Sequence, residues 1–526
     1  MHKKAVALVV FLLFFSAYFL SADTYYVDRV NGDNSNDGLT PSTAWRTIAK
    51  ANYTVVPGDT VYVLAGTYSE IIKPGRSGAP GNRITYARYQ NHEVIITDID
   101  RAIDLRDRHF ITIDGFKILY PRSNAGWANL GFPDGSSTYN IIQNCYMEGC
   151  DEYNGIHING NDSHHNRILY NTLKGVCGPE TPRYGGPSDL IALKNGAHHN
   201  LIEGNILIDA PHAVIDSQDE SSYNIIRDNT IINQFHTGIN LFTNSHFNLV
   251  EGNQILDSGD ICGTYSCPGN ECGSGSDQDM GRRYHSGILV GSSHNIFRNN
   301  FFRNNGSGIY ISSRDNRESL GNHIYNNLFY KNYMGLYINS TYPVKWTITK
   351  NNLFFDNIEY ELSIFINDGL FTNYFICNFI LGSFIKYCFE GVRPIAWLER
   401  NYPTQWRDNI TADPGLIGRE LSTLIKLART HLGDRGTWLT STLGPGSGTN
   451  IPVRDAWYFM DGWELIEGDL IQLEGQTEAA HVIHVDYDNN IIVVDTPLSW
   501  EANQGVSISY ENQAPSIGPF EYSRDR

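Results

Sequence analysis

One short pattern recurs at a fixed interval in the middle of the chain: Asn200-Leu-Ile-Glu-Gly-Asn205, Asn224-Ile-Ile-Arg-Asp-Asn229 and Asn248-Leu-Val-Glu-Gly-Asn253. The first asparagines of these copies lie 24 residues apart, and copies at Asn166, Asn295 and Asn322 are separated from their neighbours by longer intervals. Each copy reads as a short strand and a turn, because Asn tolerates left-handed turn conformations. A repeat of this length indicates a stacked-coil solenoid.

A second pattern of the type Gly-Ile-x-Ile lies between the asparagine copies, at 155–158, 238–241, 287–290, 308–311 and 335–338. Alternation with period two places the isoleucines inside and the intervening residue outside. No segment between Asn140 and Asn352 shows a sustained period of about 3.6 residues, which excludes an α-solenoid. The sequence therefore predicts an all-β fold, a right-handed parallel β-helix, in which coils bury apolar faces only by stacking. The repeated asparagines are expected to form ladders between coils rather than to act in catalysis.

The two ends of the chain differ from this repeating region. Residues 1–22 carry Lys3 and Lys4 before an apolar run that ends in small residues, which predicts a secretory signal peptide. Residues 23–418 are predicted to form the β-helix domain, and residues 433–522 a small C-terminal all-β module resembling a β-barrel. The mature protein is therefore expected to be a monomer that is secreted, periplasmic or at the cell surface, without insertion into a membrane.

The charge of the chain limits its partners. The formal net charge is −18, from 39 basic and 57 acidic residues. This argues against a nucleic-acid partner, because no basic stripe is present to displace counterions from phosphate. A polyanionic sugar would need a local basic patch or a bound Ca²⁺. The close spacing of Cys262, Cys267 and Cys272 favours a disulfide over a zinc site, without fixing the pairing.

The N-terminal region resembles the cap and first coil of a known group of proteins. It reads Tyr25-Tyr-Val-Asp28, Asn31-Gly-Asp-Asn-Ser-Asn-Asp-Gly38 and Pro57-Gly-Asp-Thr-Val-Tyr-Val63. Together with the repeats, this makes the chain similar to exported β-helix proteins of the pectate and alginate lyase type, a group that also includes some glycoside hydrolases and alginate epimerases. The resemblance implies a polysaccharide substrate. It does not imply one reaction, because this scaffold carries several chemistries.

A row of polar residues is predicted on one flank of the helix, near insertions at about residues 175–187 and 257–284. Aligning the Gly-Ile-x-Ile strands puts four of them at or next to the same position of successive coils: Asp189, His212, His236 and His285. The same alignment takes His157, Ala192, Ile215 and Asn240 as the outward positions. It also brings Lys194 onto the face of His157 and near Asp189. Coils stack about 4.8 Å apart, so the row can act as one site.

A lyase that acts on uronic acids needs a base, a group that neutralises the sugar carboxylate, and a proton source for the leaving oxygen. The candidate catalytic residues are Lys194, His212, His236 and Asp189. The candidate substrate-binding residues are His157, Arg183, Asn240 and His285, with Arg183 as the partner of the carboxylate. The candidate Ca²⁺ ligands are Asp216, Asp219 and Glu220, since clustered carboxylates suit a hard cation.

Lys194 is the first choice for the base because Asp189-Leu-Ile-Ala-Leu-Lys194 is similar to the coil in which alginate and dermatan lyases of this fold carry a lysine base. Those enzymes have Arg-His-Gly on the next coil, where this chain reads His212-Ala-Val-Ile-Asp-Ser217. Two alternatives remain open. Asp189 and Asp216 can serve a glycoside hydrolase, whose two carboxylates flank one bond. The row can also bind sugar without catalysis.

Overall fold

The computed structural model describes residues 22–119, 127–130, 136–150, 155–175, 189–210, 212–234, 236–258, 285–313, 317–366, 372–381, 385–411, 432, 434–511 and 513–519. Arg183, the segment from Cys262 to Cys272, and all of the predicted signal peptide except Ala22 lie outside these residues. Within the described ranges, no helix has both the length and the apolar character needed to cross a membrane.

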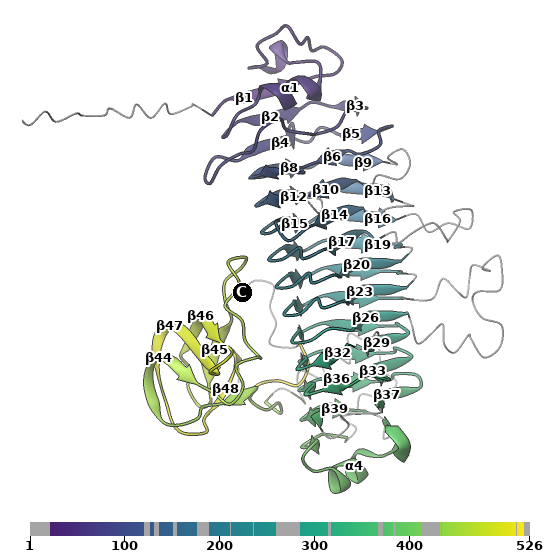
Figure 1. Cartoon of the computed structure of the whole chain (residues 1–526), viewed down its shortest axis with the longest axis vertical. Coiled ribbons are helices and arrows are strands. Elements are labelled where there is room, and N and C mark those ends of the chain that lie inside the picture. Colours follow the sequence, from purple (N-terminus) through teal and green to yellow (C-terminus); the bar gives the residue numbers. More distant parts are fainter. Residues whose placement is uncertain are drawn as a thin grey trace, which may run out of the picture.

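The chain winds into a right-handed parallel β-helix, as predicted, with three long sheets running along the stack (Figure 1). The 14-stranded sheet contains β1 (Thr24–Val27), β2 (Thr60–Val63), β4 (Ile84–Arg88), β8 (Ile111–Asp114), β12 (Ile141–Gln143), β15 (Arg167–Leu169), β18 (Leu201–Glu203), β21 (Ile225–Arg227), β24 (Leu249–Glu251), β27 (Ile296–Arg298), β31 (His323–Tyr325), β35 (Ile348–Lys350), β38 (Tyr374–Ile376) and β42 (Trp406–Arg407).

The second long sheet, of 12 strands, positions the candidate site. It contains β6 (Ile103–Asp104), β10 (Ala128–Leu130), β14 (Ile156–Asn159), β17 (Ile191–Lys194), β20 (Ala213–Ser217), β23 (Thr237–Leu241), β26 (Ser286–Val290), β29 (Ser307–Ile311), β33 (Met334–Ser340), β37 (Tyr360–Ile366), β40 (Ile385–Tyr387) and the antiparallel β41 (Gly391–Arg393).

The third long sheet, also of 12 strands, closes each coil. It contains β3 (Gly66–Tyr68), β5 (Val94–Thr97), β9 (Lys117–Leu119), β13 (Tyr146–Cys150), β16 (Thr172–Gly175), β19 (Ile206–Ile208), β22 (Thr230–Ile232), β25 (Gln254–Leu256), β28 (Phe301–Arg303), β32 (Leu328–Tyr330), β36 (Leu353–Phe355) and β39 (Phe379–Ile380). Two short parallel pairs, β7 (Arg108–His109) with β11 (Ser137–Thr138) and β30 (Ser319–Leu320) with β34 (Val344–Lys345), lie at turns.

Short helices lie at the two ends of the stack. The 3-10 helix Pro41–Thr43 and α1 (Ile48–Thr54) lie near the first coils, and Cys388–Glu390 and α4 (Ile395–Asn401) lie at the opposite end (Figure 1). Helix α1 begins after Thr47, whose side chain accepts a hydrogen bond from the backbone N–H of Lys50. Such a cap satisfies one of the donors that a helix leaves unpaired at its start.

The asparagines form ladders through the stack, which confirms the prediction of a structural role. The Asn229 side chain donates to the side-chain oxygen of Asn253 at 3.0 Å and to the carbonyl of Ile202 at 2.9 Å. The backbone N–H of Asn229 donates to the same oxygen of Asn253 at 3.0 Å. Asn229 and Asn253 are fully buried. The ladder therefore satisfies turn polar groups that water cannot reach, at intervals fixed by the coil spacing.

The core follows from the inward columns of the strands. Ile191, Ile215 and Ile239 are partners in register on successive coils and are fully buried. In the third long sheet the inward column changes from Ile231 and Ile255 to Phe302, Phe329 and Phe354. The rings of these phenylalanines stack, with centroids 4.9 and 4.4 Å apart. Each coil buries its apolar side chains only against its neighbours, so the repeat is required for stability.

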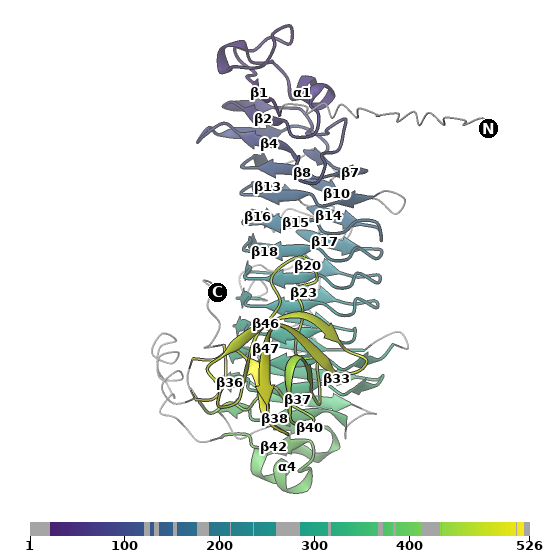
Figure 2. The same ribbon diagram turned by 90° about the vertical axis from the view of Figure 1, so that its left-hand side faces the viewer.

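The C-terminal module is a six-stranded antiparallel sheet, and it lies beside the stack rather than at its end (Figures 1 and 2). Its strands are β43 (Thr440–Ser441), β44 (Gly446–Pro452), β45 (Leu470–Leu473), β46 (Ala479–Asp486), β47 (Ile491–Trp500) and β48 (Gly505–Ile508). It packs on the outer face of the 14-stranded sheet, where Ile225 and Leu249 of the helix join an apolar cluster with Phe459 of the module. Arg298 of β27 also donates two hydrogen bonds to Asp469, at 2.8 and 2.6 Å.

Candidate functional site

The candidate site lies on the outer face of the second long sheet, on strands β14, β17, β20 and β23. The 14-stranded sheet, against which the module packs, forms a different face of the helix. The register corrects one expectation from the sequence. Ile215 is paired with Ile191 and Ile239 in the core, and the outward residue of β20 is Asp216, paired with Ala192 and Asn240.

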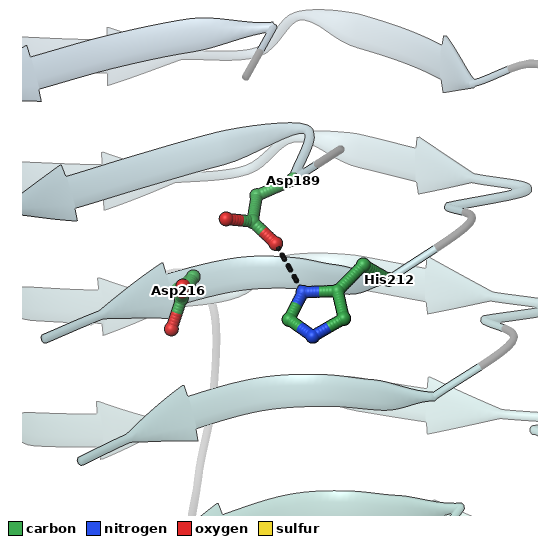
Figure 3. Close-up of side chains that lie close together, drawn as sticks. All are labelled: Asp189, His212 and Asp216. Carbon is green, nitrogen blue, oxygen red and sulfur yellow. Dashed lines mark hydrogen bonds and ion pairs between the residues drawn. The ribbon is translucent and has the colours of Figure 1, made fainter. Parts of the chain in front are cut away.

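The centre of the site is a hydrogen-bonded aspartate and histidine (Figure 3). Asp189 Oδ1 lies 2.8 Å from His212 Nδ1 and also accepts the backbone N–H of Ala213 at 3.2 Å. The Asp189 side chain is fully buried, whereas that of His212 is 37% exposed. A carboxylate held in this way fixes the ring orientation and favours a proton on Nδ1. Nε2 of His212 is therefore the nitrogen left to exchange a proton with a ligand.

Lys194 lies next to this pair and contacts a second buried carboxylate. Its Nζ donates to Asp216 and lies 3.8 Å from Asp189 Oδ2. The Lys194 side chain is 14% exposed and that of Asp216 only 1%. Asp216 also accepts hydrogen bonds from Gln218 at 2.9 Å and from Asn240 at 2.8 Å. The donors that surround Asp216 compensate its loss of water and fix the position of the Lys194 amine.

The burial of two carboxylates shifts proton affinities in the cluster. Burial, together with repulsion from Asp189, raises the pKa of Asp216 to about 6, against the opposing charge of Lys194. Burial by itself lowers the pKa of His212, but the hydrogen bond and charge of Asp189 outweigh it and raise that pKa above the usual value. Burial and charge thus shift the proton affinities of two groups in one cluster, a pattern found in active sites and also in structural ion-pair networks.

The other predicted residues lie around this centre. The His236 ring stacks on His212 at a centroid distance of 5.1 Å, and His285 follows at 6.4 Å from His236. His157 lies one coil to the other side, paired in register with Ala192. Burial lowers the pKa values of both His157 and His285 to about 4, so these rings are neutral at neutral pH. The predicted row is therefore assembled in the structure, although its chemical roles remain predictions.

The predicted calcium ligands do not gather at one point. Asp219 and Glu220 lie in the turn after β20 with positive φ angles of 56° and 67°, and Glu220 is exposed. In the described part of the chain, one group of three potential ligands has its ligand atoms within 4.8 Å of one another: Asp189, His212 and Asp216. That group contains an imidazole, and the Lys194 amine lies against its carboxylates. This group supplies two carboxylates and an imidazole, whereas Ca²⁺ takes six to eight oxygen ligands including waters, so a calcium site stays a prediction.

Sequence reasoning missed two features of the site. They are the contact of Gln218 with Asp216 and the contact of Asp216 with Lys194. The sequence had instead suggested Asp216 as a calcium ligand. A strict 24-residue step from Ala192 reaches Asp216 and then Asn240, and the same step from Lys194 reaches Gln218. Matching the Gly-Ile-x-Ile pattern instead shifted β20 by one residue, and a shift of one exchanges the inner and outer faces of a strand.

Comparisons with known proteins cover parts of the chain. The family described as "Periplasmic copper-binding protein (NosD)" matches residues 276–383, a range that contains His285 but not His212 or Lys194. A protein of Bacillus subtilis (strain 168) described as "Uncharacterized protein YwoF" is 32% identical over 139 residues. This match covers 24% of the chain and 29% of that protein, so the chain matches less than a third of the relative's length.

Solved structures with related folds include polysaccharide lyases. A variant of the family 6 alginate lyase AlyGC gives a TM-score of 0.39 with 14% identity, covering 61% of this chain and 50% of that one. A mannuronic-acid-specific family 6 lyase from human gut microbiota gives 0.39 with 13% identity, covering 57% and 76%. The pectate lyase Pel9A gives 0.32 with 12% identity, covering 66% and 78%. At these values the comparisons carry no argument about the reaction.

Proposed function

We propose that the protein is an exported enzyme that cleaves a uronic-acid-containing polysaccharide by β-elimination on the outer face of β17 and β20. The observation that supports this proposal is the hydrogen bond between the buried carboxylate of Asp189 and the half-exposed ring of His212, beside the Lys194 amine. Export rests on residues 1–22, which have the pattern of a signal peptide.

His212 is the base of the proposed reaction. Its Nε2 takes the proton from the carbon next to the sugar carboxylate, while Asp189 holds Nδ1 and stabilises the imidazolium that forms. The electrons of the C–H bond form the new C=C bond, and the bond to the glycosidic oxygen breaks. The departing oxygen then receives a proton from the His212 imidazolium. The reaction needs no water and no redox partner, and the new chain end is unsaturated.

Lys194 supplies positive charge rather than the base function. A base role would first require separating its amine from Asp216, whose carboxylate is almost fully buried. Breaking a buried ion pair leaves a charge without compensation, which typically costs about 3–5 kcal/mol. Kept in place, the amine offsets the charges of Asp189 and Asp216, so that a sugar carboxylate approaches His212 against less repulsion. Lys194→Ala is therefore expected to reduce turnover, because it removes a positive charge and because Asp216 is then no longer held in place.

Hydrolysis fits the geometry less well. A glycoside hydrolase needs two carboxyl groups that reach the two sides of one glycosidic bond. Asp189 and Asp216 do lie near each other, but their side chains are 0% and 1% exposed and are bonded to His212 and Lys194. Neither carboxylate presents an oxygen to solvent. The exposed group of the cluster is an imidazole, which favours proton abstraction.

Product analysis of the mature chain tests the proposal. The protein is incubated with alginate, pectate and glycosaminoglycans, with and without Ca²⁺, and both ultraviolet absorbance and reducing ends are followed. The proposal expects absorbance and reducing ends to rise together on at least one uronate polymer. It expects His212→Asn to lower both signals by a factor of at least about 100. The control is His246→Gln, a half-buried histidine in a turn outside the site, which should remain active. Reducing ends without absorbance would establish hydrolysis, and no product from any of these polymers would contradict the proposal.

A further inference from the structure

We propose a second site, a groove on the outer face of the first coils that binds a glycan segment without cutting it. The cavity has a volume of about 590 Å³ and lies on strands β2, β4 and β8 of the 14-stranded sheet. Its lining consists of Thr60, Tyr62, Thr85, Ala87, Arg88, Tyr89, Gln90 and Asp114. The volume is in the range of small-ligand sites. The inference takes its ligand class, a polysaccharide, from the proposed function.

The groove arises from the register of three strands. Tyr62, Ala87 and Asp114 are partners on β2, β4 and β8 and all point outward. Ala87 has only a methyl group, so a hollow remains between the ring of Tyr62 on one side and the carboxylate of Asp114 on the other. Thr60 and Thr85, two residues earlier on β2 and β4, lie beside this hollow and supply hydroxyl groups.

One wall of the groove is aromatic. Tyr62 and Tyr89 meet edge to face at a centroid distance of 5.8 Å, and Tyr26 completes the cluster at 5.9 Å from Tyr62 and 5.6 Å from Tyr89. All three side chains are partly exposed. None of the three hydroxyl groups takes part in a hydrogen bond with another described residue. The rings are therefore held by one another, while their hydroxyl groups remain available to a ligand.

The opposite wall is polar and fixed. The Asp114 carboxylate accepts hydrogen bonds from Gln143 at 2.8 Å and from Asn144 at 2.9 Å. Arg88 is exposed, and its side chain passes over Gly115, where an added Cβ would lie 2.8 Å from it. A pyranose ring has an apolar C–H face and an edge of hydroxyl groups. A groove with aromatic rings on one wall and charged groups on the other, of which Asp114 is held by hydrogen bonds, matches both surfaces of such a ring.

The 14-stranded sheet also carries a surface against which another part of the chain packs, and this surface differs from the groove. Beneath the C-terminal module, one outward column of the sheet reads Leu201, Ile225, Leu249 and Ile296. At the first coils that column reads Thr24, Thr60, Thr85 and Thr112. The module covers the apolar part, whereas the threonine part borders the groove. Figure 2 shows that the strands of the module lie away from the first coils, β2, β4 and β8. The threonine part is polar, so we expect a hydrated, hydroxyl-rich ligand to bind there rather than a second protein.

Two variants test the groove from opposite directions. Tyr62→Ala combined with Tyr89→Ala removes the aromatic wall, and Ala87→Phe fills the hollow while keeping both tyrosines. Each is made in the His212→Asn background, so that the polymer is not cut, and is run in native gels containing alginate, pectate or xylan. The melting temperature of each variant checks folding. We expect the parent to be retarded by at least one polymer and both variants to bind that polymer with a Kd at least tenfold higher.

The outcomes separate this inference from the proposed function. Retardation that both groove variants retain would overturn the second site, whatever the outcome of the product analysis. Retardation that both variants lose, in a protein that produces no unsaturated ends, would support the groove and reject the lyase. With His212 intact, both variants should also cleave short oligosaccharides at the parent rate, since such substrates do not reach from one sheet to the other. An equal loss on short substrates would overturn the separation of the two sites.

Discussion

Two clusters of buried charges lie on different faces of the same helix, and only one of them is open to solvent. On the 14-stranded sheet, Arg298 binds Glu251 at 2.7 Å and Asp469 at 2.6 Å, and its side chain is 3% exposed. On the second long sheet, which carries the candidate site, Asp189 binds His212, whose side chain is 37% exposed. Both clusters bury carboxylates and compensate them with cations. The first is sealed by the module, while the second ends in a ring that a ligand can reach.

The comparison shows that a buried charge does not by itself mark an active site. Arg298 keeps its proton, because the carboxylates of Asp469 and Glu251 outweigh burial and hold its pKa well above the usual value. In the open cluster the pKa of Asp216 is raised to about 6 and that of His212 is raised as well. Arg298 therefore carries a fixed charge that attaches the module, although burial raises the pKa of its partner Glu251 as well. The open cluster differs in that it includes a ring that a ligand can reach.

The largest expected effect is on activity at the open cluster. His212→Asn should lower kcat/KM by a factor of about 10²–10⁴, the usual contribution of a general base. The free energy of unfolding should fall by only about 1–2 kcal/mol, because Asp189 keeps the Ala213 N–H and Lys194 as partners. Initial rates of ultraviolet absorbance and urea denaturation measure the two quantities. A variant that keeps a tenth or more of the parent activity would remove His212 from the mechanism.

A substitution in the sealed cluster of Arg298 should lower stability and leave activity unchanged. Arg298→Met leaves Glu251 and Asp469 buried without their cation, which should lower the free energy of unfolding by about 3–5 kcal/mol. Activity per folded molecule should be unchanged, since the site lies on another sheet. Arg227→Met is the control. It breaks a more exposed ion pair with Glu203 and should cost only about 1 kcal/mol. Equal losses in the two variants, measured by urea denaturation, would contradict the assignment.

Stability should also depend on pH through the open cluster. A carboxyl whose pKa is raised on folding binds more protons in the folded state, so the stability it contributes is lost as pH rises from about 4 to 6. His212, whose pKa is raised above 6.5, extends this loss to higher pH. The decrease due to Asp216 should be at most about 3 kcal/mol. Denaturation curves at several pH values should show a smaller decrease for Asp216→Asn than for the parent, and parallel curves would contradict the shift.

The smallest effect is expected from a single rung of the asparagine ladder. Asn229→Ala removes its hydrogen bonds to Asn253 and Ile202 inside the stack and leaves two donors of Asn205 without their acceptor, and should cost about 1–3 kcal/mol. Asn401→Ala, at the end of α4, removes one exposed hydrogen bond to Trp397 and should change stability by less than about 0.5 kcal/mol. Urea denaturation distinguishes the two. Similar effects would mean that the ladder contributes little to stability.

The sequence determined the fold more firmly than the site. The 24-residue step and the asparagine ladder predict stacked coils, because both are properties of single repeats. The pairing of Lys194 with Asp216 depends on the register between two coils, and an error of one residue in β20 hides it. The position of the module depends on contacts such as Arg298 with Asp469, which are 171 residues apart, so no local pattern reveals them.

The pH dependence of cleavage tests the central claim most directly. If His212 is the base and Asp189 raises its pKa, kcat/KM from ultraviolet absorbance should rise with pH along a limb whose midpoint lies above 6.5. Asp189→Asn removes the charge that raises this pKa, so its limb should move to lower pH while the maximal rate falls. A limb at the same pH in the parent and in Asp189→Asn would show that another group takes the proton, and would contradict the account.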